Sequence, residues 1–403
     1  MAAIAHAFAE QNSLQTDTSG VFTDVVSITS GNFTTGKKYL IYATANINEH
    51  SGSGTCWIKL LHGSTDFSES LMARTTQSDS SLYWSCYGFL TLWTAVSGEG
   101  VKIQFRRTSN STARVDQVSL LAINLSDDIV ENTDWFFAER TTDDALGTTP
   151  DDGASVTFTP SVAGDNWLVL TYAGYTIGSV STTHVISRIE RSGEATSTTP
   201  TCRIRPPTAT LGEVALLARA YNLGAASNTF KEVSEETATN STRNYSSIFV
   251  LNLNKFRNHA VAYTDGTVNL GTTDYGDELQ TISLTPNVTG DVWIVAYWNG
   301  DINSAANQLE SRVQVDNSDQ PSSQTSDNYQ FLLDNDATSE TPLFLSTMTS
   351  LSNSAHTIDL DGSINATTGT PTGKQRALIA VTMELAPTIE LDTEELLGQM
   401  ASF

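Results

Sequence analysis

The chain has 403 residues, of which 39% are hydrophobic and 16% charged, and its formal net charge is −24. This length exceeds what one hydrophobic core ordinarily serves, so the sequence indicates several domains. The excess of 45 acidic over 21 basic residues repels phosphate backbones, which argues against nucleic acid as a direct partner.

The N-terminal stretch MAAIAHAFAEQNS lacks the basic segment and the continuous apolar run of a secretory signal. No part of the chain approaches the roughly 20 apolar residues of a membrane span. We therefore expect a protein that is neither secreted by the general route nor inserted into a membrane. Cys56, Cys86 and Cys202 lack metal-ligand spacing and are expected to be buried thiols, although Cys56 and Cys86 could lie close together.

The first third of the chain consists of short apolar segments separated by turn residues. A strand is predicted at 5–10, an alternating strand at 25–29, and an aromatic-led strand after Gly36. The segments CWIKLLHG, LYWSCYGFLTLW and VKIQFRR then precede an almost continuously apolar strand at 118–125. Alternation predicts a strand with one wet face, and continuous apolarity predicts a central strand covered on both faces.

The second third repeats this order. Its predicted strands lie at 134–140 and 155–159, then after Gly164, and the closing apolar strand lies at 247–253. The segments between them are HVISRIE, EVALLARAYNL and NTFKEV. Three landmarks in the same order at nearly constant spacing indicate an internal repeat.

The last third repeats it again. Strands are predicted at 259–265 and 281–285, after Gly290, and at 378–385, with LESRVQV, TPLFLSTMTSL and HTIDLDG between them. The three glycines are 128 and then 126 residues apart. We predict that they occupy turns with positive φ, and that proline ends the strand before two of them, at Pro160 and Pro286. One aromatic residue should anchor each core: Tyr39, Trp167 and Trp293.

Turn residues every 8–12 positions predict antiparallel sandwiches and not a parallel sheet with crossover helices. The fold class is therefore all-β, with three tandem jelly-roll-like β-sandwich domains of about 128 residues. The predicted boundaries are 1–127, 134–256 and 258–387, followed by a C-terminal tail at 388–403. The short connectors predict a compact or semi-rigid row, and a linear stalk and an imitation of a trimer are both open.

Sequence motifs for chemistry are absent: there is no G-x-S-x-G, no H-E-x-x-H, no phosphate loop and no dinucleotide fingerprint. The six histidines are scattered, and the acidic segments DLDG (359–362) and DNDA (335–338) are expected to be turns and not calcium sites. An active repeat should also carry an unusual insertion or a His/Asp/Glu cluster that its siblings lack, and none stands out. We predict no catalytic, cofactor-binding or metal-binding residues, and no enzyme.

Two kinds of binding residue are candidates. Aromatic residues near predicted loops, chiefly Tyr297 and Trp298 with Tyr175 and Tyr329 beside them, could stack on sugar rings, although core or rim packing is the favoured interpretation. The tail TIELDTEELLGQMASF could dock on another subunit, fold back or fray. Its apolar candidates for docking are Leu396, Leu397, Met400 and Phe403.

Repeated modules, Ser/Thr/Asn-rich strands and acidity together resemble bacteriophage virion surface proteins, which include capsid decoration proteins, head fibres and tail appendages. The resemblance is one of class and carries no site residues. It implies a structural protein in a multi-copy assembly, made in the host cytoplasm, with capsid or tail subunits as partners. The alternative function is a carbohydrate- or receptor-binding adhesin that contacts host-surface glycans, and a glycan depolymerase is a more distant one.

Overall fold

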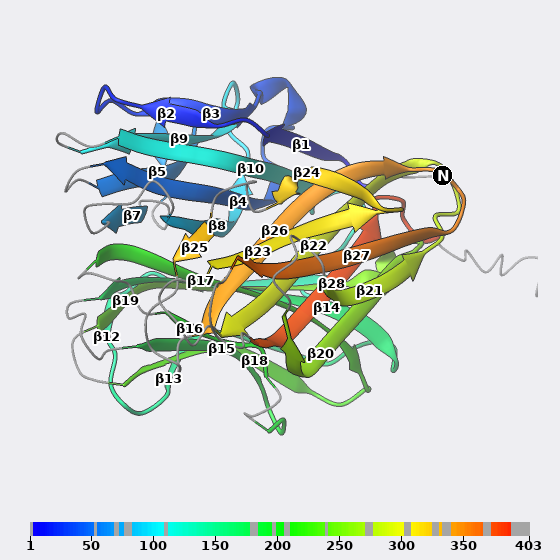
Figure 1. The fold of residues 1–403 in the computed structure, drawn as a ribbon. Helices are drawn as coiled ribbons and strands as arrows, with labels where there is room; N and C mark the ends of the chain where they lie inside the picture. Colours follow the sequence, from blue (N-terminus) through cyan, green and yellow to red (C-terminus); the bar gives the residue numbers. More distant parts are fainter. Residues whose placement is uncertain are drawn as a thin grey trace, which may run out of the picture.

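In a computed structural model of the protein, the described residues are 3–51, 55–67, 72–75, 83–108, 112–177, 184–195, 199–204, 210–237, 241–270, 277–301, 308–324, 330–332, 340–365 and 372–387. Strands fill most of these residues, and their helical segments are two 3-10 turns, η1 (Ser30–Asn32) and η3 (Leu253–Lys255). The prediction of an all-β fold made of antiparallel sandwiches is confirmed (Figure 1).

The first sandwich contains β1 (His6–Gln11), β2 (Gln15–Asp17), β3 (Thr23–Ile28), β4 (Lys38–Ser51), β5 (Thr55–His62), β6 (Thr65–Asp66), β7 (Met72–Thr75), β8 (Tyr83–Thr94), β9 (Val101–Arg107) and β10 (Thr112–Asn124). One sheet has the order β1-β10-β4-β8 and the other β3-β9-β5-β6, while β2 pairs with β10 and β7 with β5. The antiparallel sheets face each other, so every principal strand buries one face between them.

The second sandwich contains β11 (Trp135–Arg140), β12 (Asp144–Ala145), β13 (Asp151–Phe158), β14 (Asp165–Ile177), β15 (Val185–Arg191), β16 (Thr201–Ile204), β17 (Thr210–Leu223), β18 (Asn228–Glu236) and β19 (Ser241–Asn252). Its sheets, β11-β19-β14-β17 and β13-β18-β15-β16, have the same order as those of the first sandwich.

The third sandwich contains β20 (His259–Asn269), β21 (Asp277–Leu284), β22 (Gly290–Asp301), β23 (Gln308–Val315), β24 (Ser318–Gln324), β25 (Gln330–Leu332), β26 (Glu340–Leu351), β27 (His356–Asn365) and β28 (Thr372–Thr382). Its sheets are β20-β28-β22-β26 and β21-β27-β23-β25, with β24 on β23. In each sandwich the chain alternates between two sheets of four principal strands in the jelly-roll manner, and short strands such as β12 on β19 extend them. The sheets that hold β10, β19 and β28 are called the inner sheets below.

The closing strand of each repeat, β10, β19 or β28, lies between two neighbours in its inner sheet. Its apolar half is buried on both faces, as the continuous apolar sequence predicts. One face covers the sandwich's own core, and the other face covers a neighbouring sandwich. The inner sheets therefore lie between sandwiches, and water does not reach either face of their central strands.

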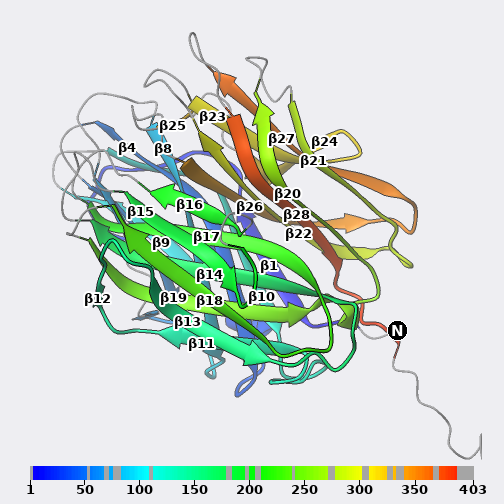
Figure 2. The same ribbon diagram turned by 90° about the horizontal axis from the view of Figure 1, so that it is seen from below.

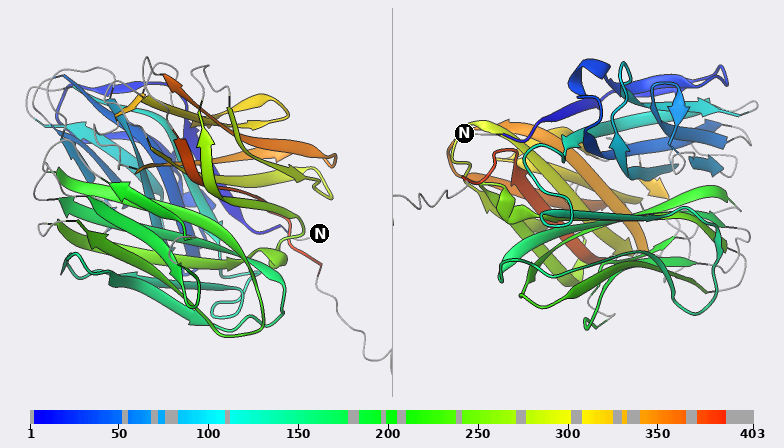
Figure 3. Two further views of the ribbon diagram at one scale, coloured as in Figure 1. Left: turned by 60° about the horizontal axis from the view of Figure 1, so that its bottom comes forward. Right: turned by 180° about the vertical axis from the view of Figure 1, so that it is seen from behind.

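The three sandwiches close into a ring (Figures 1 and 3). The corresponding edge strands β8, β17 and β26 all touch one another. Each also touches the next sandwich's inner sheet: β8 meets β14, β17 meets β22, and β26 meets β4. Because the last contact joins the third sandwich to the first, the expected row and the linear stalk are both wrong. The imitation of a trimer describes the arrangement.

One strand pair makes this closure continuous. Strand β25 of the third sandwich pairs in parallel with β8 of the first, through Gln330 opposite Tyr83 and Phe331 opposite Trp84. The inner sheet of the first sandwich and the second sheet of the third therefore form a single ten-stranded sheet. The equivalent strands β7 and β16 touch β17 and β26 across the other two junctions.

The repeated glycine behaves differently in the third sandwich. Gly36 and Gly164 have φ of 80° and 92°, as predicted for turn residues, whereas Gly290 is the first residue of β22 and does not have positive φ. The register shifts accordingly, since Leu168 lies opposite Leu251 in the second sandwich and Trp293 lies opposite the equivalent Val381 in the third. A shift of one residue turns every side chain to the other face.

The shift corrects one prediction. Tyr39 and Trp167 face the cores of their own sandwiches, where Trp167 packs on Phe158 with ring centroids 4.6 Å apart. Trp293 instead faces the first sandwich and packs edge-on against Tyr42 at 5.6 Å. It is therefore an anchor between sandwiches and not of its own core. The two prolines follow the ends of β13 and β21, as predicted.

Candidate functional site

The ring has an axis that passes through three equivalent residues. Gly88, Leu216 and Phe344 are spaced 128 residues apart in β8, β17 and β26. A Cβ added to Gly88 would lie 2.6 Å from Leu216 Cδ2 and 3.1 Å from Phe344 Cε2. Glycine is therefore needed because the other two side chains fill the space on the axis. A small, a medium and a large residue share one point of near-threefold symmetry.

The axis becomes exposed towards one end of the molecule. Four residues after the axial trio, Leu92, Ala220 and Met348 are partly buried against the common core. Two residues further along, at the ends of the three strands, the equivalent residues are exposed. These exposed residues are Thr94, Asn222 and Ser350. Equivalent positions thus change from buried to exposed together, and none of the six side chains carries a charge.

Three equivalent contacts surround the axis at this end, each between the first strand of one sandwich and the start of an inner strand of another. Between the first and third sandwiches, His6 Nε2 lies 3.1 Å from Asp291 Oδ2. Between the second and first, Lys38 Nζ lies 5.8 Å from the centre of the Trp135 ring. The third contact joins His259 to the second sandwich: Asn166 Nδ2 donates to His259 Nε2 at 3.0 Å.

The electrostatics differ among these equivalent contacts. Burial lowers the pKa of His259 below its usual 6.5, and the nearby Asp165 carboxylate opposes that shift. The Lys38 ammonium lies over an aromatic ring and also pairs with Glu131 at 2.6 Å. The equivalent inner-strand positions therefore hold the neutral Asn166, the cationic Lys38 and the acidic Asp291. The backbone of the ring is nearly symmetric, but its side chains are not.

Both ends of the described chain and both connectors lie at this end of the molecule, which we call the terminal face (Figure 2). Ile4 N donates to Met383 O at 2.9 Å, and Ala3 pairs with Glu384. The connector at 253–258 contacts the last described segment, where Ala386 N donates to Lys255 O at 2.8 Å. The terminal face comprises the start of β4, β14 and β22, the end of β8, β17 and β26, the connectors 126–134 and 253–258, and the residues 3–6 and 383–387.

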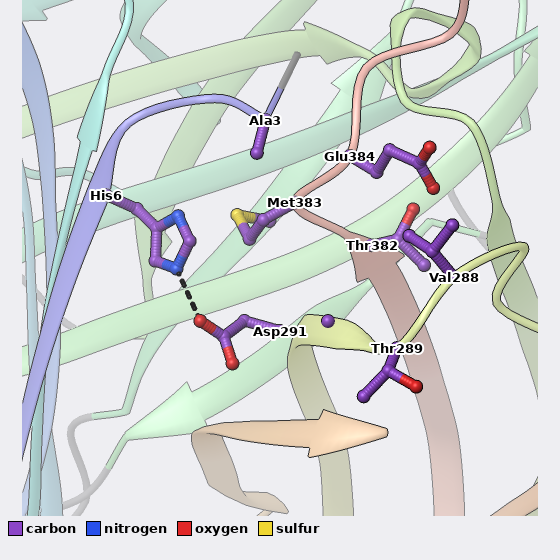
Figure 4. Close-up of a pocket in the computed structure, with 9 residues that line it drawn as sticks. Ala3, His6, Val288, Thr289, Asp291, Thr382, Met383 and Glu384 are labelled. Atoms are coloured by element: carbon purple, nitrogen blue, oxygen red, sulfur yellow. Dashed lines mark hydrogen bonds and ion pairs between the residues drawn. The ribbon is translucent and has the colours of Figure 1, made fainter. Parts of the chain in front are cut away.

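A recess of about 220 Å³ lies in the terminal face at the junction between the third and first sandwiches (Figure 4). His6 and Asp291 meet on one side of the recess, and Glu384 lies on the opposite side. There Arg257 Nη1 donates to Glu384 Oε1 at 2.9 Å. Its remaining wall is formed by Ala3, Val288–Gly290, Thr382 and Met383. The other two junctions are crossed by the connectors 126–134 and 253–258.

A buried charged network distinguishes the second sandwich from the other two. Arg243 and Glu232 are both fully buried, and Arg243 Nη1 donates to Glu232 Oε2 at 3.3 Å. The same guanidinium donates to Asp151 Oδ2 at 2.7 Å and to Asp144 Oδ2 at 3.0 Å. Burial raises the pKa of Glu232 above its usual value, and the Arg243 charge opposes that shift.

The other oxygen of Glu232 accepts three hydroxyl groups. Tyr175 donates from 3.2 Å and Ser187 from 3.0 Å, and Ser234 donates as well. Burial raises the pKa of Tyr175, and the nearby Glu232 charge adds to the shift. The polar atoms of the network are largely paired with one another, so its chemistry is that of an internal brace. Glu232, Asp151 and Asp144 thus form an acidic cluster around Arg243 that does not stand out in the sequence.

The sequence did contain a signal for this network. In the strand NTFKEVSEE, strict alternation places Glu232 and Ser234 on the same face as the core residue Phe230. A carboxylate on a buried face needs a cation, and Arg243 on β19 of the facing sheet supplies it.

The candidate sugar-stacking residues that the structure describes are buried within strands. Trp298 is fully buried in the core of the third sandwich. Tyr297 is fully buried between the third and second sandwiches, where its hydroxyl donates to Thr201 O at 2.9 Å. The favoured interpretation of core packing therefore describes both rings, since adjacent residues point to opposite faces of β22 and both faces are covered. Tyr175 belongs to the buried network, and Tyr329 and the tail residues Leu396, Leu397, Met400 and Phe403 lie outside the described residues.

The acidic segments and the cysteines are the remaining candidates from the sequence. The segment at 359–362 is strand and not a turn, and Arg312 Nε donates to Asp361 Oδ2 at 3.1 Å. The described ranges contain no cluster of three metal-ligating side chains, and the segment at 335–338 lies outside them. The three cysteines are free thiols. Burial raises the pKa of Cys86 to about 12, and its Sγ lies 3.0 Å from Phe344 O of the third sandwich.

No protein-family model and no curated protein matches the chain. Several solved structures, among them the three that follow, are similar in fold. A chain of an archaeal virus described as a triple jelly roll with a turret assembly is 10% identical, covering 93% of this chain and 91% of that one, with a TM-score of 0.19. A chain of Sulfolobus turreted icosahedral virus is 12% identical, covering 92% and 86%, with a TM-score of 0.18. A family 35 carbohydrate-binding module from Clostridium thermocellum is 16% identical, covering 30% and 90%, with a TM-score of 0.17.

These likenesses concern the jelly-roll fold alone, and such TM-scores carry no argument about function. Within the described residues, no helix has the length and apolarity to span a membrane.

Proposed function

We propose that the chain is a non-enzymatic structural protein on the exterior of a bacteriophage particle, assembled in the host cytoplasm, where it decorates the capsid or forms an appendage. The observation that carries this proposal is the closed ring of three equivalent sandwiches around an axis. A single chain of this form presents the symmetry of a trimer, and symmetric contacts are how multi-copy shells and appendages are built.

The use of large aromatic residues supports a structural role. Tyr42 and Trp293 pack against each other between sandwiches, and Tyr297 and Trp298 are buried on either side of β22. The glycan-binding alternative loses Tyr175, Tyr297 and Trp298 as stacking surfaces by this burial. The acidic surface of net charge −24 keeps such a ring soluble before it assembles.

The experiment is quantitative mass spectrometry of purified particles, combined with immunogold labelling of intact ones. We expect the chain at a fixed number of copies per particle, accessible to antibody on the outside. Absence of the chain from purified particles would contradict the proposal. A glycan array that binds the purified chain at micromolar concentration would favour the adhesin instead.

The tail at 388–403 is proposed as a docking segment, because it follows directly on the terminal face. A variant that ends at Pro387 should be incorporated into particles less well than the full chain. Unchanged incorporation would remove the tail from the mechanism.

A further inference from the structure

We infer that the terminal face docks on the threefold axis of a symmetric protein partner, with one copy of this chain on each axis. The inference rests on the proposed function and specifies the symmetry of the partner, the face that binds it and the stoichiometry.

The symmetry of the terminal face comes from its backbone. Strands β4, β14 and β22 all begin there, and β8, β17 and β26 all end there. The three contacts made by His6, Trp135 and His259 repeat around the same axis. A surface with three equivalent lobes fits a partner that repeats its own contacts at 120°.

The centre of this face is uncharged, although the chain as a whole carries −24. The axis ends in Thr94, Asn222 and Ser350, above the partly buried Leu92, Ala220 and Met348. Charged groups further out include the pairs Lys38 with Glu131 and Arg257 with Glu384. An uncharged centre within a rim of charges is the usual anatomy of a protein–protein interface.

Exposed valines lie in the first connector and in the turn that leads into the start of β14, both at the terminal face. Val130 in the first connector is 58% exposed, and Val162, two residues before the glycine Gly164, is 55% exposed. Val288 occupies the position equivalent to Val162 in the third sandwich and lines the recess. The residues 388–403 also continue from this face, beyond the contact of Ala386 with Lys255.

The stoichiometry follows from the axial residues. In a ring of three separate copies, each copy would place the same residue on the axis. Here Gly88, Leu216 and Phe344 fill it with three different sizes, and the ring is already complete within one chain. A single copy therefore satisfies a threefold site, in any of three rotational settings that the partner's symmetry makes equivalent.

The test is cryo-electron microscopy of particles that carry the chain, with reconstruction of individual threefold sites without imposed symmetry. We expect one ring per axis, terminal face inward, in three settings. Chains that lie off the axis, face outward, or occur as three copies around each axis would overturn the inference and leave the proposed function intact. Particles that lack the chain would refute the proposed function, and this inference with it.

A pair of variants tests the face without imaging. Val130→Arg/Val162→Arg adds two charges to the terminal face, and Val21→Arg/Leu14→Arg adds them to exposed sites of the first sandwich away from it, where the residues are 67% and 40% exposed. We expect the first variant to lower the number of copies per particle about tenfold and the control to leave it unchanged, because an unpaired charge buried in an interface is costly. Equal incorporation of both variants would overturn the assignment of this face. Analytical ultracentrifugation of the free chain should show monomers, and a dimer that these same Arg substitutions disrupt would assign the face to a second copy instead.

Discussion

Adding one methyl group on the axis should destabilise the whole ring. In Gly88→Ala, the new Cβ would lie 2.6 Å from Leu216 Cδ2, 3.0 Å from Ala43 O and 3.1 Å from Phe344 Cε2. All three neighbours are buried, so none can move into solvent. Overpacking of this kind costs about 1–3 kcal/mol. Gly31→Ala is the matched control, because a Cβ there meets nothing within 4 Å.

The assay is urea denaturation followed by tryptophan fluorescence, with changes in the free energy of unfolding taken from the midpoint at a fixed slope. Leu216→Ala alone should cost about 2–5 kcal/mol through the cavity it leaves. In the double variant, the methyl group added at position 88 fills part of that cavity. The loss of unfolding free energy in the double variant should therefore be smaller than the sum of the two single losses by about 1 kcal/mol or more. Strict additivity, or a Gly88→Ala variant as stable as Gly31→Ala, would show that the edge strands of the three sandwiches do not meet at this point.

Three further predictions concern the buried network and the junctions. Arg243→Met should lower the free energy of unfolding by about 3–5 kcal/mol, because it leaves the Glu232 carboxylate buried without its cation. Adding Glu232→Gln should recover part of the loss in the same urea assay. An Arg243→Met variant with unchanged stability would contradict the network. The pKa of His259 is lower in the folded chain than its usual 6.5, so stability present above that pH should be lost as the pH falls below it. Thermal unfolding of the His259→Gln variant between about pH 8 and pH 5.5 should show a smaller loss than the wild type, and equal losses would refute this. Ala3→Cys/Glu384→Cys should form a disulfide that alters migration on a non-reducing gel, since the two residues pair across the third junction; no disulfide under mild oxidation would mean that the ends do not meet.

The individual sandwiches could be predicted from the sequence because their signals are local. Alternating and continuously apolar strands have different periods, and turn residues separate them at regular intervals. The repeat of the glycine and the aromatic residue also located the start of β4, β14 and β22. What it could not show was that Gly290 begins its strand and is not in the turn, a difference of one residue that moves Trp293 to the opposite face.

The ring itself could not be predicted because it depends on contacts between repeats. The sequence of each inner sheet says that both faces are buried, but not which sandwich covers the second face. Tyr297 and Trp298 illustrate this: neighbours on one strand point in opposite directions, and only the ring explains why both are buried. The axial residues are Gly88, Leu216 and Phe344, which occupy equivalent positions but differ in size. Alignment of the repeats therefore gives no reason to group them.

Small-angle X-ray scattering of the free chain tests the closed ring most directly, because only the contact of the third sandwich with the first distinguishes a ring from a row. Compact packing of 403 residues corresponds to a radius of gyration of about 22 Å. Three sandwiches of about 14 Å each placed end to end would give about 30 Å on the same scaling. A closed ring should give the smaller value at all protein concentrations, and a value near the larger one would contradict the closure of the third sandwich on the first.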